Sequence, residues 1–151
     1  MQTQFKLILG CDLAAYDFKV KVLEELRRRG YDVTDIGCNS SLEGDYPPIA
    51  EEVATRVVSG EFDRGLLICG TGQGMAMAAN RVKGARCALI YENFTAIMSR
   101  EHNNSNVMAS GAWLISLEKY LEITETWLFG KYNPGKHDHR INYMLEMDNK
   151  K

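Results

Sequence analysis

The segment of this chain best suited to chemistry is a cysteine followed by three alternating glycines. It runs Cys69-Gly70-Thr71-Gly72-Gln73-Gly74 and follows the apolar run Leu66-Leu67-Ile68. Glycines let a backbone fold closely around a ligand, and amide N–H groups at a helix start attract an anion or a developing oxyanion. A helix start also favours the thiolate form of a neighbouring cysteine, so Cys69 is a candidate base or nucleophile. The alternative, which carries equal weight, is that Cys69 is only a buried residue at a strand end and that the glycines only form a tight turn.

Two common phosphate-binding loops do not fit this segment. Its spacing is GxGxG rather than GxGxxG, and it follows the third predicted strand rather than the first. No GxxxxGK[ST] sequence occurs in the chain. A Rossmann-type oxidoreductase and a P-loop nucleotidase are therefore disfavoured.

A histidine beside asparagines forms a second candidate cluster. The segment Ser99-Arg100-Glu101-His102-Asn103-Asn104-Ser105-Asn106 stands at the predicted end of a helix, just ahead of a strand. An imidazole there can act as acid or base, and the amide of Asn103 can hold a hydroxyl or a carbonyl. Helix termination by these residues, with His102 bonded to the last carbonyls, is the competing interpretation.

Basic residues open the last predicted helix. Lys136 and Arg140 are four positions apart and share a helix face, where they could grip one phosphate, although solvated surface charge is the usual alternative. His137 and His139 are two positions apart and share no face, so they predict no metal site. Asp12, after the first strand, could hold a sugar hydroxyl or ring oxygen, but aspartate is also a preferred helix N-cap.

Apolar runs alternate with segments of helical periodicity along the whole chain. The predicted strands are 5–10, 31–36, 65–69, 85–90 and 106–109, and the predicted helices are 12–30, 47–59, 74–81, 93–102, 116–129 and one after Pro134. Parallel neighbours need crossover connections, so the pattern predicts one α/β domain over residues 1–151. Its doubly wound, Rossmann-like, five-stranded parallel sheet has helices on both faces and a C-terminal helix. Ligands of such sheets lie at the carboxyl ends of the strands.

Composition and charge exclude several classes of function. Lys and Arg number 18 against 20 Asp and Glu, and the net charge of -2 leaves no basic field for nucleic acid or acidic membranes. No apolar run approaches the ~18 to 20 residues that span a bilayer, and residues 1–5 lack a signal-peptide pattern, so a cytoplasmic protein is expected. The four cysteines show neither disulfide-scaffold nor zinc spacing: Cys11, Cys38, Cys69 and Cys87.

Six motifs in the same order resemble the ribose-5-phosphate isomerase B family, which also includes the galactose-6-phosphate isomerase subunits. They are Gly10-Cys11-Asp12, Asp45-Tyr46-Pro47, Ile68 to Gly74, Ala78 to Gly84, Ser99 to Asn103, and Gly135-Lys136-His137 with Arg140. The resemblance covers nearly the whole chain. It implies the same doubly wound sheet, no metal or other cofactor, and active sites shared between the chains of a homodimer or a dimer of dimers.

The resemblance also implies a role for each matching residue. Cys69 is the expected base that moves a proton between two carbons, Thr71 belongs with it in the catalytic set, and His102 assists ring opening. The expected substrate contacts are Asp12, Tyr46 and Asn103 on the sugar, the loop Gly70, Gly72, Gln73 and Gly74 around the developing anion, and Lys136 and Arg140 on the phosphate. Aldose–ketose isomerisation through a cis-enediolate needs a base, an oxyanion site and a ring-opening acid.

Three positions depart from the family pattern. Leu13 stands where histidine is usual, Trp113 where a phosphate-binding arginine is usual, and Lys136 where arginine is usual. Tryptophan cannot pair with phosphate, so Trp113 is expected in the site as a surface on which a sugar face could stack. The expected function is cofactor-independent isomerisation, with ribose 5-phosphate and ribulose 5-phosphate as the default pair.

Three alternatives stay open from the sequence. The substrate could be a tetrose or hexose phosphate, such as galactose 6-phosphate. The chain could also be a non-catalytic sugar-phosphate sensor, although Cys69 and His102 are both intact, or a thiol hydrolase, although nothing demands a Cys–His pair for acyl transfer. The expected partners are a sugar phosphate and a second copy of the chain.

Overall fold

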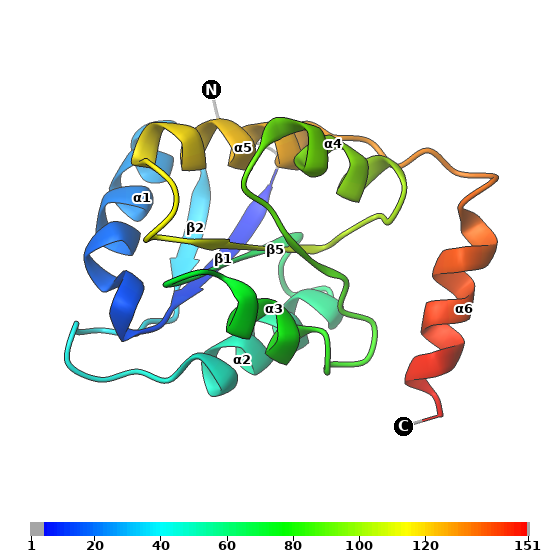
Figure 1. The fold of residues 1–151 in the computed structure, drawn as a ribbon, viewed down its shortest axis with the longest axis horizontal. Coiled ribbons are helices and arrows are strands. Elements are labelled where there is room, and N and C mark those ends of the chain that lie inside the picture. Colours follow the sequence, from blue (N-terminus) through cyan, green and yellow to red (C-terminus); the bar gives the residue numbers. More distant parts are fainter. Residues whose placement is uncertain (1–4, 151) are drawn as a thin grey trace.

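Five parallel strands form the centre of the molecule. They are β1 (Lys6–Cys11), β2 (Asp32–Asp35), β3 (Arg64–Cys69), β4 (Cys87–Leu89) and β5 (Val107–Gly111). The computed structural model describes residues 5–150 and gives the strand order β2-β1-β3-β5-β4 (Figure 1). The three central strands are buried almost throughout, which explains why they appear in the sequence as continuous apolar runs rather than alternating ones.

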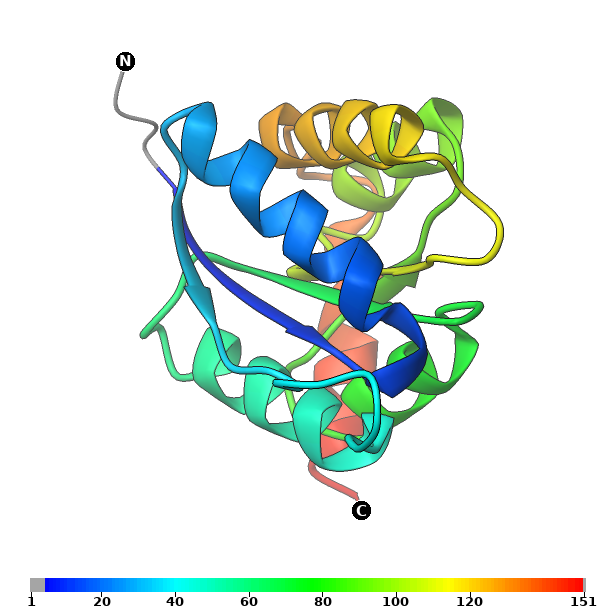
Figure 2. The ribbon, with the colours of Figure 1, turned by 90° about the vertical axis from the view of Figure 1, so that its left-hand side faces the viewer.

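Helices cover both faces of the sheet (Figure 2). They are α1 (Tyr16–Arg28), α2 (Tyr46–Val58), α3 (Gln73–Ala79), α4 (Asn93–Glu101), α5 (Leu117–Phe129) and α6 (Asp138–Asp148). One core lies beneath α1, α4 and α5, and a second lies beneath α2 and α3. The C-terminal α6 covers neither face and stands at one end of the molecule, opposite α1 (Figure 1).

The strand order places a crevice between β1 and β3. The chain leaves β1 for α1 on one face of the sheet and leaves β3 for α3 on the other face. The loops after these two neighbouring strands therefore diverge, which is the arrangement that opens a ligand crevice in doubly wound sheets. Asp12 and Cys69 stand at this crevice, one at the end of each strand.

The predicted fold class and all of the predicted elements are confirmed, with small differences at their ends. The clearest difference is at the start of the fourth strand. Ala85 and Arg86 were predicted within it, but β4 begins only at Cys87. At that point the amide of Arg86 bonds to the side chain of Asn106 instead of joining the ladder. Gly30 ends the first helix with a φ of 89°, as its position predicts.

The two ends of the chain fall outside this description. Residues 1–4, where the absence of a signal peptide was expected, and residue 151 lie beyond the described residues. Across residues 5–150, no helix is both long and apolar enough to cross a membrane.

Candidate active site

Asp12 fills the capping role, one of the two that the sequence leaves open for it. Its Oδ1 accepts a hydrogen bond from the amide of Ala15 at 3.2 Å, which caps a short 3-10 turn, η1 (Leu13–Ala15). Its own amide bonds to the carbonyl of Ile68 at 3.2 Å, which ties it to β3. Burial raises the pKa of the Asp12 carboxyl. The capping role is therefore confirmed, and the capping carboxylate also lies at the edge of the crevice.

Cys69 ends β3 with its thiol turned into the glycine loop. Its side chain is only 5% exposed, and Sγ accepts a hydrogen bond from the amide of Gly72 at 3.0 Å. One of the loop amides expected to be free for an anion is thus already engaged by the thiol.

Aromatic rings flank the glycine loop on two sides. A Cβ built on Gly70 would lie 2.8 Å from the indole of Trp113, and one built on Gly74 would lie 2.8 Å from the phenol ring of Tyr46. Gly72 has a φ of 84° and lies against the backbone of Ser110. Gly70 and Gly74 therefore allow the close approach of the two rings, and Gly72 allows the left-handed backbone. These requirements hold whether or not the loop also binds a ligand.

Two other loop side chains and two of the three departures from the family pattern, Leu13 and Trp113, also lie at this edge. Thr71 is half-buried and its Oγ1 accepts from the amide of Gln73 at 3.4 Å, while Gln73 itself is exposed. Trp113 is 70% exposed even though its ring covers Gly70, and Leu13 is also exposed beside Asp12. Two apolar side chains thus stand where the family pattern has a histidine and a phosphate-binding arginine.

His102 and the basic residues form a second cluster. His102 caps the C-terminal end of α4, with its amide bonded to the carbonyl of Met98 at 2.9 Å, so the expected terminating role is confirmed. Its ring stacks on that of His137, with ring centroids 4.2 Å apart. Arg140 bonds to the same His137 ring at 3.2 Å. Lys136 and Asn103, the sequence neighbours of His137 and His102, are both exposed.

A buried arginine fixes the end of α4 that presents His102. The guanidinium of Arg100 donates to the carbonyls of Ser105 and Gly130 and to the side chain of Asn104. Ser105 in turn accepts from the indole N–H of Trp127 at 2.8 Å. Burial lowers the pKa of Arg100 to about 10. The helix end is therefore held to α5 and β5 by hydrogen bonds that satisfy a buried charge.

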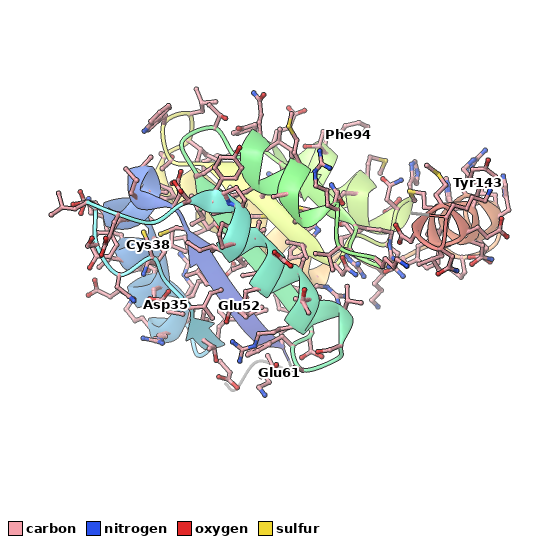
Figure 3. All side chains as sticks on the ribbon, turned by 90° about the horizontal axis from the view of Figure 1, so that it is seen from below. Asp35, Cys38, Glu52, Glu61, Phe94 and Tyr143 are labelled. Atoms are coloured by element: carbon pink, nitrogen blue, oxygen red, sulfur yellow. The ribbon has the colours of Figure 1, made fainter. Side chains whose placement is uncertain are left out.

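The structure places the two clusters at opposite edges of the sheet. Because α4 leads from the carboxyl end of β4 back to the start of β5, His102 lies at the amino edge, whereas Cys69 lies at the carboxyl edge. At ~3.3 Å per residue, the strands separate these edges by roughly 16 Å. Figure 3 shows Tyr143 of α6 and Cys38, beyond β2, at opposite ends of the molecule. Within one chain, the two clusters of candidate residues, called half-sites from here on, therefore do not come together.

Sequence reasoning assigned no functional role to two residues near these half-sites. The hydroxyl of Tyr91 is buried and has no hydrogen-bond partner within residues 5–150, and burial followed by the charge of Cys69 raises its pKa. Its position directly after the fourth predicted strand is the signal that could have found it. His137, considered above only as a metal ligand, touches two of the expected site residues. In the described part of the chain, no three His, Cys, Asp or Glu side chains gather as a metal site.

The chain is similar to known proteins along nearly its whole length. Residues 7–144 match the family model described as Ribose/Galactose Isomerase. The chain is 38% identical to ribose-5-phosphate isomerase B of Escherichia coli (strain K12) over 146 residues, covering 97% of this chain and 98% of that one. It is 36% identical over 130 residues to D-erythrulose-4-phosphate isomerase of Pectobacterium atrosepticum, covering 85% and 86%.

A solved structure gives the same result in three dimensions. The structure of Clostridium thermocellum ribose-5-phosphate isomerase B superimposes with a TM-score of 0.93 at 40% identity, covering 96% of this chain and 98% of that one. The fold therefore agrees along nearly the whole chain. The chain belongs to the ribose/galactose isomerase family and is an aldose–ketose isomerase of a sugar phosphate.

Proposed function

We propose that this isomerase interconverts ribose 5-phosphate and ribulose 5-phosphate, with Cys69 as the base. The observation that supports this most is the position of Cys69 at the end of β3, with Sγ against a loop amide in the β1–β3 crevice. The thiolate would remove the proton from C2 of the open-chain aldose. The C2–H electrons form a C1=C2 double bond, and the carbonyl oxygen O1 takes up the negative charge. The proton of the C2 hydroxyl then passes to O1, the C2=O carbonyl forms, and the electrons of the double bond take the proton back from the thiol at C1.

The glycine loop would stabilise the cis-enediolate between these two proton transfers. Oxyanion sites act through donors that are already aimed at the developing charge. The amides from Gly70 to Gly74 and the hydroxyl of Thr71 are the donors nearest Cys69 in the chain. Asp12 and Tyr46, at the same edge of the sheet, would hold the sugar oxygens.

A second copy of the chain would complete each site. Ring opening is assigned to His102, a sugar contact to Asn103, and phosphate binding to Lys136 and Arg140. These residues belong to the half-site at the far edge of the sheet. In a symmetric dimer, the half-site of one copy can face the complementary half-site of the other, which gives two complete sites. We propose this homodimer, alone or paired into a dimer of dimers. The cytoplasm is the proposed location, because phosphorylated sugars do not cross apolar membranes.

A different sugar phosphate is the second candidate substrate. The exposed indole of Trp113 and the exposed Leu13 favour it, because neither can pair with a phosphate as arginine does. A tetrose or hexose phosphate would place its phosphate differently relative to this apolar surface. The base and the loop would keep the same roles with any of these substrates.

Solvent-deuterium incorporation followed by NMR tests both the mechanism and the substrate. Wild-type enzyme is incubated in D2O with tetrose, pentose and hexose phosphates and with the free sugars. We expect exchange at the carbon beside the carbonyl for ribose 5-phosphate, and a loss of at least about a thousandfold in Cys69→Ala, as is typical when the reacting base is removed. Cys87→Ala, which removes the partly buried thiol that starts β4, is the matched control and should retain activity.

The possible results separate the proposals cleanly. Exchange with only a tetrose or hexose phosphate would replace ribose 5-phosphate by that sugar and leave the Cys69 mechanism in place. Exchange that survives in Cys69→Ala would overturn the assignment of the base. Equal losses in the Cys69 and Cys87 variants would show that the effect is structural.

A further inference from the structure

His137 is a buried polar side chain at the start of α6. It is 7% exposed although the neighbouring Lys136, Asp138 and His139 are all exposed. A histidine at the beginning of a helix on the molecular surface would normally be solvated. Its burial therefore needs a physical explanation.

The first contact of His137 is with the ring of His102. The two imidazoles are stacked, with centroids 4.2 Å apart and planes inclined by 22°. The two residues come from different elements, since His102 ends α4 and His137 precedes α6. The face of His137 thus limits the orientations open to the His102 ring.

The second contact is with the guanidinium of Arg140. Nη1 of Arg140 lies 3.2 Å from Nδ1 of His137. A guanidinium has donors only, so Nδ1 must accept and the ring proton of a neutral His137 must sit on Nε2. Nη1 also donates to the carbonyl of Lys136, so the arginine is held from two directions.

The surroundings of His137 keep it neutral. Burial lowers its pKa most, followed by His102, Lys136 and Arg140, while Asp138 opposes them. A neutral ring is the form that can accept from Arg140 and lie against His102 without charge repulsion. Its Nε2 is buried without a hydrogen-bond partner among the described residues. An unpaired buried donor is costly, which makes a role in packing alone a poor explanation.

We propose that His137 is a positioning residue that holds His102 and Arg140 in one arrangement, its ring face against the first and its Nδ1 against the second. It links the residue assigned to ring opening with a residue assigned to the phosphate. The kinetic part of this proposal rests on the proposed function, whereas the structural part does not. Two variants separate the contacts: His137→Phe keeps a ring against His102 but removes the acceptor for Arg140, and His137→Ala removes both.

NMR of the imidazole Cε1–H groups tests the structural part without any substrate. The chain has only 3 histidines, so the three signals can be assigned by single substitutions. A proton above a stacked ring is shielded, so the His102 signal should move downfield in His137→Ala. The exposed His139→Ala is the matched control on the same helix and should leave the His102 signal in place. In wild type, the His137 signal should titrate below the ordinary histidine value of ~6.5.

Steady-state kinetics with the sugar phosphate that the enzyme turns over tests the two contacts separately. In His137→Phe, we expect KM to rise about fivefold to tenfold with kcat near wild type, because Arg140 loses its partner. In His137→Ala, kcat should also fall about tenfold, because His102 loses its orientation. His139→Ala should match wild type in both constants.

Several results would overturn the proposal. A His102 signal that does not move in His137→Ala would show that stacking does not orient it, and so would a kcat unchanged in a folded Ala variant. If His137→Ala does not fold, the KM of His137→Phe decides instead, and a KM equal to that of wild type would overturn the proposal. Wild-type enzyme that turns over no sugar phosphate would overturn the proposed function, and the NMR result would still decide the positioning role.

Discussion

Each glycine of the loop after β3 is required for a different physical reason. Gly72 adopts a left-handed backbone and lies against Ser110, whereas Gly70 and Gly74 make room for the rings of Trp113 and Tyr46. The glycine spacing alone predicts a tight loop at this point. The rings could not be predicted, because they come from segments distant in sequence and nothing local indicates which glycine each one covers.

Substitution of Gly72 should cost more stability than substitution of another left-handed glycine. Gly60 has nearly the same φ, 86° against 84°, but nothing lies within 4 Å of its Cβ position, while that of Gly72 lies 2.8 Å from the backbone of Ser110. We expect Gly60→Ala to lower the free energy of unfolding by about 1 kcal/mol and Gly72→Ala by about 2 to 4 kcal/mol, measured in urea. Equal losses would mean that the backbone at Ser110 moves away without cost.

At the scale of elements, a buried ion pair joins α1 to the end of β2. Nζ of Lys19, which is 2% exposed, lies 2.7 Å from Oδ2 of Asp35 and donates to the carbonyl of Cys38 at 3.1 Å. The pair fixes the start of the loop that runs from β2 toward α2. That loop also touches the crevice, because the amide of Leu13 bonds to the carbonyl of Gly44.

Neutralising Asp35 should therefore destabilise the protein substantially. Asp35→Asn keeps an oxygen for the amide of Gly37 but leaves the buried Lys19 charge unpaired, and we expect a loss of about 2 to 3 kcal/mol in urea unfolding. Adding Lys19→Met should recover most of that loss, because the charge is then gone. The exposed pair Arg28–Glu25, also at 2.7 Å, is the control, and Glu25→Gln should leave stability unchanged. No recovery in the double variant would contradict this account.

Most of the helices and strands could be predicted from local sequence patterns, but the order of the strands in the sheet could not. The helix over 93–102 follows from apolar spacing and agrees with α4 to within one residue. The burial of Lys19 could not be predicted from local pattern, because a charged side chain on a helix is ordinarily solvated and only the tertiary partner Asp35 reverses this. The order β2-β1-β3-β5-β4 depends on how whole units pack, which is encoded in contacts distant along the chain.

At the scale of the whole molecule, the two half-sites lead to a test by complementation. In the proposed dimer, Cys69→Ala and His102→Ala should each be inactive alone, since each variant would lack one half of every site. After mixing and subunit exchange, half of the dimers are mixed and each has one intact site, so about a quarter of wild-type activity should return. Light scattering should give twice the 17.1 kDa of the chain, or four times for a dimer of dimers. No recovered activity despite demonstrated exchange would place both residues in the site of one chain.

The two tryptophans also give the protein a built-in optical probe. Trp113, exposed over Gly70, should emit at long wavelength and be quenched by iodide, whereas Trp127 is 0% exposed and should be shielded from the quencher. A ligand that enters the crevice would cover the first indole and leave the second unchanged. Intrinsic fluorescence of the unlabelled enzyme can therefore report occupancy of the carboxyl-edge half-site separately from the integrity of the core.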